Sequence, residues 1–289
     1  MTTVLVTGAV GFLGKQVLKH LAKTSVTVIP VVRPGQEAQI VRSDNIKRAL
    51  LTPNLFVESS AALDEMCSGV DIVIHTAWSV KEIDYLRSTE NLSCLTGTLS
   101  LATAAARSGV RRFVGIGSCA EYGFDSTDLN ENSELKPKTL YGAAKASSFL
   151  SLNEYFNLNA VSFAWCRVFY LYGEGEPPQR LFSYLRDQLD RGEPALLSSG
   201  TQVRDYLDVA DAASRICQVA LSDLVGAVNI CSGVAQTIRD LSEKIADEYG
   251  RRDLLKFYAR PENSDDPKYV VGDNKKFSER FGGLSESKV

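Results

Sequence analysis

The sequence contains very little histidine: only His20 and His75 occur in 289 residues. A histidine-rich metal site is therefore not available, and a Ser-His-Asp arrangement would need one of these two residues. We expect no bound metal. The six cysteines include no Cys-x-x-Cys pair, which indicates small buried side chains in a reducing compartment and not a disulfide framework.

Long apolar runs and a strong net charge are missing as well. No apolar run approaches the roughly 20 residues that a transmembrane helix needs. The N-terminal stretch MTTVLVTG has no basic region or cleavage site and leads directly into a strand-like pattern. A net charge of −3 provides no electrostatic basis for binding nucleic acid or an anionic membrane. We expect a cytoplasmic protein with no membrane or nucleic-acid partner.

The first half of the sequence alternates short β-branched runs with helical stretches. The runs are TVLVTG, SVTVIPVV, VDIVIHTA, RRFVGIGS and AVSFAWCRV, and helices are expected near 15–23, 89–107 and 141–155. Strands that are apolar throughout are typical of a parallel sheet with helices on both faces. The pattern predicts an α/β fold, a Rossmann-type doubly wound parallel sheet.

Beyond about Gly173 this alternation loosens. A Pro/Gly loop, GEGEPPQR, is followed by expected helices over 181–191 and 209–221, the strand AVNICS and a polar, charged tail. We interpret this half as a smaller C-terminal α/β substrate lobe. The predicted division is therefore a dinucleotide-binding domain over 1–172 and the smaller lobe over 173–289, with the chain interleaving between them.

A glycine-rich turn, TGAVGFLG, lies between the first strand and the first helix. Gly8, Gly11 and Gly14 differ from the Gly-x-Gly-x-x-Gly fingerprint by one residue in the first spacing. Glycines let a backbone turn tightly and approach a pyrophosphate at a helix N-terminus. The turn therefore predicts a dinucleotide site, with Phe12 and Leu13 as further contacts. A glycine-rich turn without a ligand is the alternative.

The end of the second strand indicates which dinucleotide binds. A carboxylate at this position would hydrogen-bond the adenosine ribose 2′-hydroxyl. The strand instead ends in PVVRPG, which places Arg33 there. A guanidinium can bind a 2′-phosphate with two hydrogen bonds and can stack on adenine. Arg33 therefore favours NADP(H), while NAD and a solvated arginine without a ligand stay open.

Three residues form a candidate catalytic group. YGAAK places Tyr141 and Lys145 four residues apart at the start of an expected helix, so that they share one face. The pKa of tyrosine, about 10, is high for proton transfer at neutral pH, and a nearby ammonium group is expected to lower it. Ser118 lies at the carboxyl end of a central strand, where open α/β sheets bind ligands. A Tyr-x-x-x-Lys pair alone is a weak signal.

Together these motifs resemble the short-chain dehydrogenase/reductase superfamily, and more narrowly its extended branch of nucleotide-sugar epimerases, dehydratases and reductases. The resemblance covers almost the full chain. Five further segments match in order, namely HTA, ENLSCLTGT, CRVFYLYGEG, GTQVRDYLDVADAA and VVGDNKKFSERFG.

The resemblance implies roles for particular residues. Tyr141 would be the general acid/base, Lys145 would tune it and hold the nicotinamide ribose, and Ser118 would hydrogen-bond the reacting sugar oxygen. Further cofactor contacts would come from His75, Thr76 and Ala77. The implied substrate-binding residues are Ser118, Cys119, Tyr170, Arg180 and Arg204, of which Arg204 would bind the nucleotide diphosphate.

The stretch GSCAEYG helps to choose among the reactions of this branch. Family 4,6-dehydratases have Asp-Glu directly after the catalytic Ser/Thr, whereas this chain has Cys119 and Ala120 there. Neither can do the acid/base work of eliminating water, so a dehydratase is disfavoured. Arg33 disfavours an epimerase that retains NAD, and Tyr170 stands where the family usually has Asn. Glu121 and Tyr122 are interpreted as structural or pocket-wall residues.

The chain most resembles the family's reductases of 4-keto-6-deoxy sugar nucleotides, and this resemblance implies an NADP(H)-dependent reductase that acts on the C4 keto group of a nucleotide-linked 4-keto-6-deoxyhexose. An NAD-dependent nucleotide-sugar C4 epimerase and a non-catalytic NADP-binding sensor or scaffold are the alternatives. The expected partners are the nucleotide-sugar substrate and a second copy of the chain, bound through helices 89–107 and 141–155. Aromatic residues on the second helix could equally belong to the core of the monomer, namely Phe149, Tyr155 and Phe156.

Overall fold

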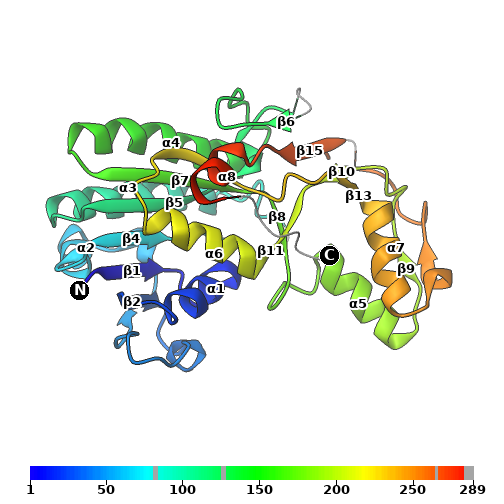
Figure 1. Ribbon diagram of the computed structural model, residues 1–289, viewed down its shortest axis with the longest axis horizontal. Coiled ribbons are helices and arrows are strands. Elements are labelled where there is room, and N and C mark those ends of the chain that lie inside the picture. The colour runs from blue at the N-terminus through cyan, green and yellow to red at the C-terminus, as the bar shows by residue number, and fades with distance from the viewer. Residues whose placement is uncertain (81–83, 125–127, 264–265, 283–289) are drawn as a thin grey trace.

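A parallel seven-stranded sheet forms the centre of the larger lobe (Figure 1). The computed structural model describes residues 1–80, 84–124, 128–263 and 266–282. The strand order is β12-β7-β5-β4-β1-β2-β3, with every neighbouring pair parallel. This is the doubly wound order and confirms the predicted fold class. The strands are β1 (Thr3–Thr7), β2 (Thr27–Val32), β3 (Leu50–Leu51), β4 (Ile72–His75), β5 (Arg112–Ser118), β7 (Ser162–Val168) and β12 (Gly226–Ile230).

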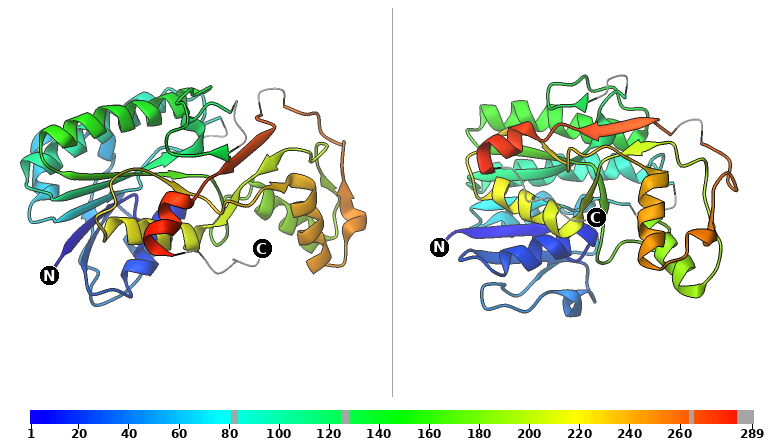
Figure 2. Two further views of the ribbon diagram at one scale, coloured as in Figure 1. Left: turned by 45° about the horizontal axis from the view of Figure 1, so that its top comes forward. Right: turned by 45° about the vertical axis from the view of Figure 1, so that its right-hand side comes forward.

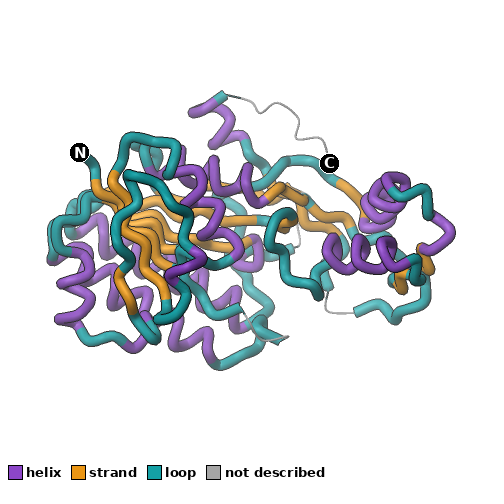
Figure 3. The backbone as a smooth tube through the Cα atoms, turned by 90° about the horizontal axis from the view of Figure 1, so that it is seen from below, coloured by secondary structure: helices purple, strands orange, loops and turns teal. Residues whose placement is uncertain are grey.

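Helices cover both faces of this sheet (Figure 3). One apolar core lies between the sheet and α1 (Phe12–Leu21), α6 (Val209–Ala220) and α8 (Lys275–Phe281). A second core lies between the opposite face and α2 (Ser60–Cys67), α3 (Glu90–Arg107) and α4 (Leu140–Leu158). Every residue of β5 is buried, as expected for a central strand covered on both faces. The sequence analysis left open whether the aromatic residues of α4 belong to a dimer interface or to the core of the monomer. The structure places all three in or against the second core, namely Phe149, Tyr155 and Phe156.

The smaller lobe lies at the other end of the molecule (Figures 1 and 2). Its core is built around α5 (Leu181–Arg191) and α7 (Ile238–Glu248). A four-stranded sheet and one short strand pair lie between it and the larger lobe, while a second short pair belongs to its own core. Their members are β6 (Asp128–Leu129), β10 (Val203–Arg204), β13 (Gln236–Thr237) and β15 (Tyr269–Gly272) in the sheet, β8 (Tyr170–Tyr172) with β11 (Tyr206–Asp208) in the first pair, and β9 (Ala195–Leu196) with β14 (Leu255–Lys256) in the second.

The chain passes between the lobes more than once. α6 and β12 follow residue 172, yet they complete the large sheet and its core. β6 precedes that residue, yet it pairs with β15 in the smaller sheet. The two lobes are therefore interleaved, and single-turn helices occupy some of the connections, namely η1 (Glu37–Gln39), η2 (Leu55–Val57), η3 (Cys119–Glu121) and η4 (Arg252–Leu254).

The polar segment after AVNICS contains helices and a strand that the sequence analysis did not expect. This segment contains α7, β15 and α8. α7 places Leu241, Ile245 and Ala246 on a buried face, and its other positions are mostly polar and exposed. An amphipathic helix with only a narrow apolar stripe has a polar average composition. Average composition therefore does not reveal such a helix, whereas the spacing of its apolar residues does.

All six cysteines are buried and unpaired, as expected for small hydrophobic side chains. Within the described ranges, no helix combines the length and the apolar character that crossing a membrane would require.

Candidate active site

The glycine-rich turn connects β1 to α1 at the carboxyl edge of the sheet. Gly8 has a φ of +65°, a conformation that side chains with a Cβ rarely adopt. A Cβ on Gly14 would lie 2.1 Å from the Gly8 carbonyl oxygen, so helix and turn meet without space for one. The Gly11 amide donates to that same carbonyl at 2.9 Å. The turn is thus a tight backbone cradle at the N-terminus of α1, which fits a dinucleotide pyrophosphate.

Residues at the end of β4 hydrogen-bond to the end of β1, directly before the glycine-rich turn. Thr76 Oγ1 donates to the Thr7 carbonyl at 2.7 Å. The His75 ring is buried between two hydroxyls, with Nδ1 2.8 Å from Thr7 Oγ1 and Nε2 2.9 Å from Thr98 Oγ1. Burial, with a smaller contribution from Lys145, lowers the pKa of His75 to about 3. His75 is therefore a neutral bridge between the two hydroxyls, and the cofactor contact expected of it stays a prediction.

The remaining predicted cofactor residues surround the turn. Phe12 and Leu13 are half-buried in the first turn of α1, and the backbone of Ala77 lies directly against Gly8. Arg33 is exposed immediately after β2, the position from which a side chain can reach the adenosine end of a dinucleotide. These residues therefore lie around the glycine-rich turn or at the end of β2, and their contacts to a dinucleotide stay predictions.

Ser118, Tyr141 and Lys145 meet at the same edge of the sheet. Ser118 ends β5, and Tyr141 lies in the first turn of α4, whose N-cap Thr139 accepts from the Gly142 amide at 3.1 Å. The Ser118 side chain is close enough to Tyr141 to lower the pKa of its phenol, against the larger effect of burial. The Lys145 ammonium lies 5.9 Å from the centre of the Tyr141 ring. The structure therefore brings the three predicted catalytic residues together.

Two aromatic residues that the sequence analysis missed hold the Tyr141 ring. Trp78 and Tyr85 make edge-to-face contacts with it, with ring centres 6.2 Å and 5.2 Å away. Burial, the largest cause, raises the pKa of Tyr141 above its ordinary value. Ser118, and not Lys145 as expected, is the group that opposes this effect, and Tyr141 is a neutral phenol at neutral pH. Trp78 directly follows the HTA motif, which is the sequence signal that could have identified it.

Lys145 is almost fully buried, with 4% of its surface exposed. Its Nζ donates to the Ile116 carbonyl at 2.6 Å and lies 3.7 Å from the centre of the Trp78 ring. Burial lowers the pKa of Lys145 to about 7, and the nearby Glu121 carboxylate partly opposes this change. The lysine is therefore close to the midpoint of its titration at neutral pH.

The predicted substrate residues fall into two groups. Arg204 is 2% exposed, pairs with Asp266 at 2.6 Å and lies 5.2 Å from the centre of the Tyr170 ring. Cys119 is close to this pair, and burial raises its pKa to about 12, which excludes a reactive thiolate at neutral pH. Arg180 forms the second group and lies beside Phe12 at the glycine-rich turn.

The guanidinium of Arg180 lies 5.8 Å from the centre of the Phe12 ring, beside the glycine-rich turn. It therefore approaches the α1 N-terminus from the smaller lobe, and both Arg180 and Arg204 lower the pKa of Tyr206. From this position the Arg180 guanidinium can reach a bound dinucleotide as well as a substrate.

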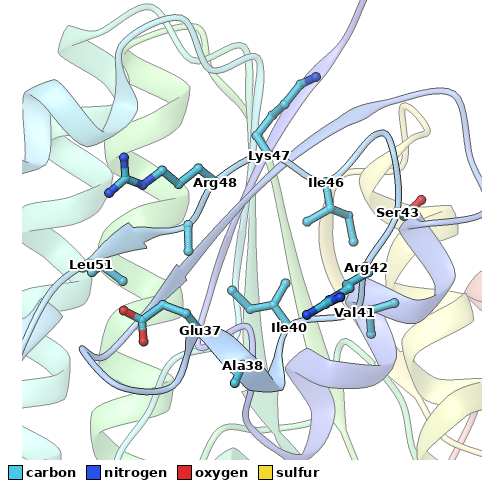
Figure 4. Close-up of a pocket in the computed structure, with 11 residues that line it drawn as sticks. Glu37, Ala38, Ile40, Val41, Arg42, Ser43, Ile46, Lys47, Arg48 and Leu51 are labelled. Carbon is cyan, nitrogen blue, oxygen red and sulfur yellow. The ribbon is translucent and has the colours of Figure 1, made fainter.

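A cavity of about 530 Å³ lies away from these residues, in the segment that connects β2 to β3 (Figure 4). Its lining includes the facing side chains of Ile40 and Ile46, and all of the lining residues come from 37–51. It contains none of the predicted site residues. We therefore assign the candidate active site to the carboxyl edge of the sheet and not to this cavity.

Residues 4–231 match the model of the family described as NAD dependent epimerase/dehydratase. The chain belongs to this family. The match covers the turn, the catalytic group and the strands that hold them, which agrees with the resemblance inferred from the motifs.

Two relatives are distant in sequence, but their similarity to this chain extends over most of each protein. A dTDP-6-deoxy-L-talose 4-dehydrogenase (NAD(+)) from Aggregatibacter actinomycetemcomitans is 23% identical over 278 residues, which are 93% of this chain and 98% of the relative. A dTDP-glucose 4,6-dehydratase from Streptomyces antibioticus is 28% identical over 265 residues, 85% of this chain and 77% of the relative.

Solved structures show the same fold. DesIV, a dTDP-glucose 4,6-dehydratase from Streptomyces venezuelae with NAD and TYD bound, superposes with a TM-score of 0.86 at 23% identity, covering 99% of this chain and 93% of DesIV. A UDP-N-acetylglucosamine 4-epimerase from Methanobrevibacter ruminantium M1 superposes with a TM-score of 0.83 at 24% identity, covering 96% and 92%. At these identities the likeness establishes the fold alone.

Proposed function

We propose that this protein reduces the C4 keto group of a nucleotide-linked 4-keto-6-deoxyhexose with NADP(H). One observation carries the proposal: Ser118 and Tyr141 come together at the carboxyl edge of the sheet, where Ser118 acts on the pKa of the Tyr141 phenol, and the next two residues, Cys119 and Ala120, have no carboxylate. The site can therefore move a proton at a carbonyl oxygen but has no Asp-Glu pair for eliminating water. A 4-dehydrogenase of a 6-deoxysugar nucleotide among the relatives supports this choice.

The chemistry follows from the protonation states of the side chains. A bound nicotinamide dinucleotide supplies the hydride. The neutral phenol of Tyr141 donates its proton to the C4 oxygen, and Ser118 hydrogen-bonds the same oxygen. The Lys145 ammonium stabilises the phenolate that Tyr141 then becomes. Arg204, which pairs with Asp266 in this structure, binds the diphosphate of the substrate.

An assay with two substrates tests this function. dTDP- and CDP-linked 4-keto-6-deoxyglucose are supplied with NADPH or NADH, and oxidation of the nicotinamide is followed by absorbance. Oxidation with either sugar is the expected result, and none with both would exclude the proposed substrate class. An NAD-dependent C4 epimerase is the second candidate, because the family is described as NAD dependent and the relatives include a protein described as a putative UDP-glucose 4-epimerase. NAD that copurifies with the protein and interconversion of UDP-glucose and UDP-galactose would indicate that activity.

Arg33 is the basis for the NADP preference within this proposal. We expect Arg33→Ala to weaken NADPH binding by about 10- to 100-fold, because a bidentate charge-assisted contact to the 2′-phosphate is lost. NADH binding should change by less than about twofold, since NADH has no phosphate for this contact. Nicotinamide fluorescence measures both affinities.

A surface arginine on the opposite lobe provides the control for this prediction. Arg191 is exposed at the end of α5 and pairs with Asp187, so Arg191→Ala removes the same charge far from the turn. It should leave both affinities unchanged. Equal preference for the two dinucleotides in the wild-type protein would contradict the role of Arg33.

We further propose a homodimer formed through α3 and α4, which lie side by side on the outside of the larger lobe (Figure 1). Leu92 on α3 is 51% exposed and Leu150 on α4 is 56% exposed. The hydroxyls of Thr96 and Ser100 donate to carbonyls of their own helix, so this surface has few unsatisfied polar groups. Such a surface can be buried at little polar cost.

Leu150→Glu tests the dimer. A carboxylate placed in an apolar interface is expected to weaken association by about 100-fold or more. Sedimentation equilibrium at several concentrations measures the change. Leu221→Glu is the matched control, because Leu221 is 42% exposed at the end of α6 and away from this surface. A wild-type monomer, or equal effects of the two substitutions, would contradict the proposed interface.

A further inference from the structure

A fully buried ion pair lies directly behind the catalytic serine. Glu121 and Arg167 are 0% and 1% exposed at their side chains, and Arg167 Nε donates to Glu121 Oε2 at 2.7 Å. Glu121 Oε1 accepts two further bonds, from the Ser118 amide at 2.8 Å and from Trp165 Nε1 at 2.9 Å. All these donors are N–H groups, which is the pattern of an ionised carboxylate. Glu121 therefore holds the backbone of Ser118 at the point where β5 ends.

The central strand is adapted to this arrangement. A Cβ on Gly117 would lie 2.2 Å from Trp165 Nε1 and 2.4 Å from Glu121 Oε1. A Cβ on Gly115 would lie 2.3 Å from the Trp165 ring. The two glycines leave the space that the indole and the carboxylate fill together. The indole also connects the pair to the active site, because the Lys145 ammonium lies 5.8 Å from the centre of its ring.

Several titratable groups face the Lys145 ammonium, but most carry no charge at neutral pH. Burial lowers the pKa of His75 to about 3 and raises the pKa of Cys94, so both are neutral. Burial likewise raises the pKa of Tyr141 on the same helix. Glu121 and its partner Arg167 remain as charged groups, and Glu121 is the largest influence that opposes the effect of burial on the pKa of Lys145. Within the described part of the chain, no carboxylate forms a direct ion pair with this lysine.

We propose that Glu121 is a positioning residue of the active site, whose buried carboxylate holds the Ser118 backbone and supplies the negative charge that keeps Lys145 an ammonium group. The inference deepens the proposed function, because it concerns the same Ser118, Tyr141 and Lys145. The charge is needed because burial of Lys145 otherwise favours the neutral amine, which cannot stabilise a phenolate on Tyr141.

The two tryptophans of the chain make the charge on Lys145 measurable without a substrate or cofactor. Trp78 and Trp165 both face the ammonium, at 3.7 Å and 5.8 Å from their ring centres. Loss of the proton removes a cation from beside both indoles and changes their emission. A titration of the resting protein between about pH 5 and 9, followed by tryptophan fluorescence, should therefore show one transition near neutrality that Lys145→Met abolishes.

Glu121→Gln is the decisive variant, because the amide retains an oxygen acceptor for the Ser118 and Trp165 N–H groups but carries no charge. We expect its transition to move to lower pH by about one unit, a tenfold change in the ratio of ammonium to amine. Arg167→Met disrupts the same pair and leaves the carboxylate charged. Its transition should stay in place or move to higher pH, because a cation near Lys145 has been removed.

Two further variants keep the test decisive. Glu121→Gln leaves Arg167 buried without its partner and can fail to fold for that reason. The double variant Glu121→Gln/Arg167→Met removes both charges, and its Lys145 transition should still occur at lower pH than in the wild type. Glu121→Asp keeps the charge but is one methylene too short to reach Ser118. It should retain the wild-type transition while kcat for the sugar falls by about tenfold at unchanged NADPH affinity.

The outcomes separate this inference from the proposed function. No transition near neutrality in the wild type, or a Glu121 variant without charge that titrates like the wild type, would overturn the role of Glu121. Absence of turnover with every 4-keto sugar, combined with the expected fluorescence shifts, would instead overturn the assigned substrate and leave the charge relation intact.

Discussion

Tyr141→Phe should reduce turnover by about a thousandfold, because it removes the only proton that the proposed mechanism delivers to the sugar oxygen. This factor corresponds to about 4 kcal/mol in the activation free energy. The ring itself should remain in place, since Trp78 and Tyr85 contact its edges and faces and the Tyr141 amide donates to the Leu86 carbonyl at 3.0 Å. NADPH affinity should therefore change by less than about twofold. Steady-state kinetics and nicotinamide fluorescence measure the two quantities.

Tyr155→Phe is the matched control for this loss of a hydroxyl. Tyr155 is on the same helix and packs against Phe156 in the core, away from Ser118. Its turnover should stay within about twofold of the wild type, since a substitution away from the reacting atoms removes no transition-state contact. A Tyr141→Phe protein that turned over at a similar rate to this control would show that another group supplies the proton.

Gly14→Ala should abolish measurable dinucleotide binding, with affinity falling by at least about 100-fold, since misplacing a binding element by an ångström has effects of this size. The added Cβ would lie 2.1 Å from the Gly8 carbonyl oxygen and 2.9 Å from its carbon, and both are backbone atoms. The turn must therefore move away from the helix, which opens the cradle. We also expect a loss of about 1–3 kcal/mol in the free energy of unfolding, typical of an overpacked site.

Gly109→Ala separates lost binding from lost stability. Gly109 has a φ of +78° with no atom within 4 Å of an added Cβ, so alanine there is strained but collides with nothing. This variant should lose about 1 kcal/mol of stability and bind NADPH like the wild type. Thermal unfolding and fluorescence titration of both variants measure this. Undiminished binding by Gly14→Ala would show that the turn does not hold the pyrophosphate.

Local signals in the sequence were enough to predict much of the larger lobe. Apolar runs bounded by glycine located the central strands, because a strand buried on both faces needs apolar residues at every position. Helix boundaries were less accurate. α1 begins at Phe12 and not near Lys15. The helix therefore starts directly after Gly11 and includes Gly14, which the sequence analysis had placed in the turn. α4 extends to Leu158, beyond the expected end near Tyr155.

What the sequence by itself determined is the kind of site: a glycine turn after the first strand, Ser118 at the end of another strand, and Tyr141 with Lys145 one helical turn apart. These features depend on backbone geometry and short spacings, which a linear pattern records directly. The Cys119 and Ala120 positions, which disfavour a dehydratase, are likewise local.

Only the tertiary structure decided how these groups are charged and held. Glu121 meets Arg167 and Trp165 from a distant strand, and Arg204 pairs with Asp266 on another segment. His75 became a buried bridge, and burial set the pKa of Lys145 near 7. The physical reason is that desolvation and Coulomb interactions depend on distances and burial in three dimensions, which residues far apart in the chain acquire only when it folds.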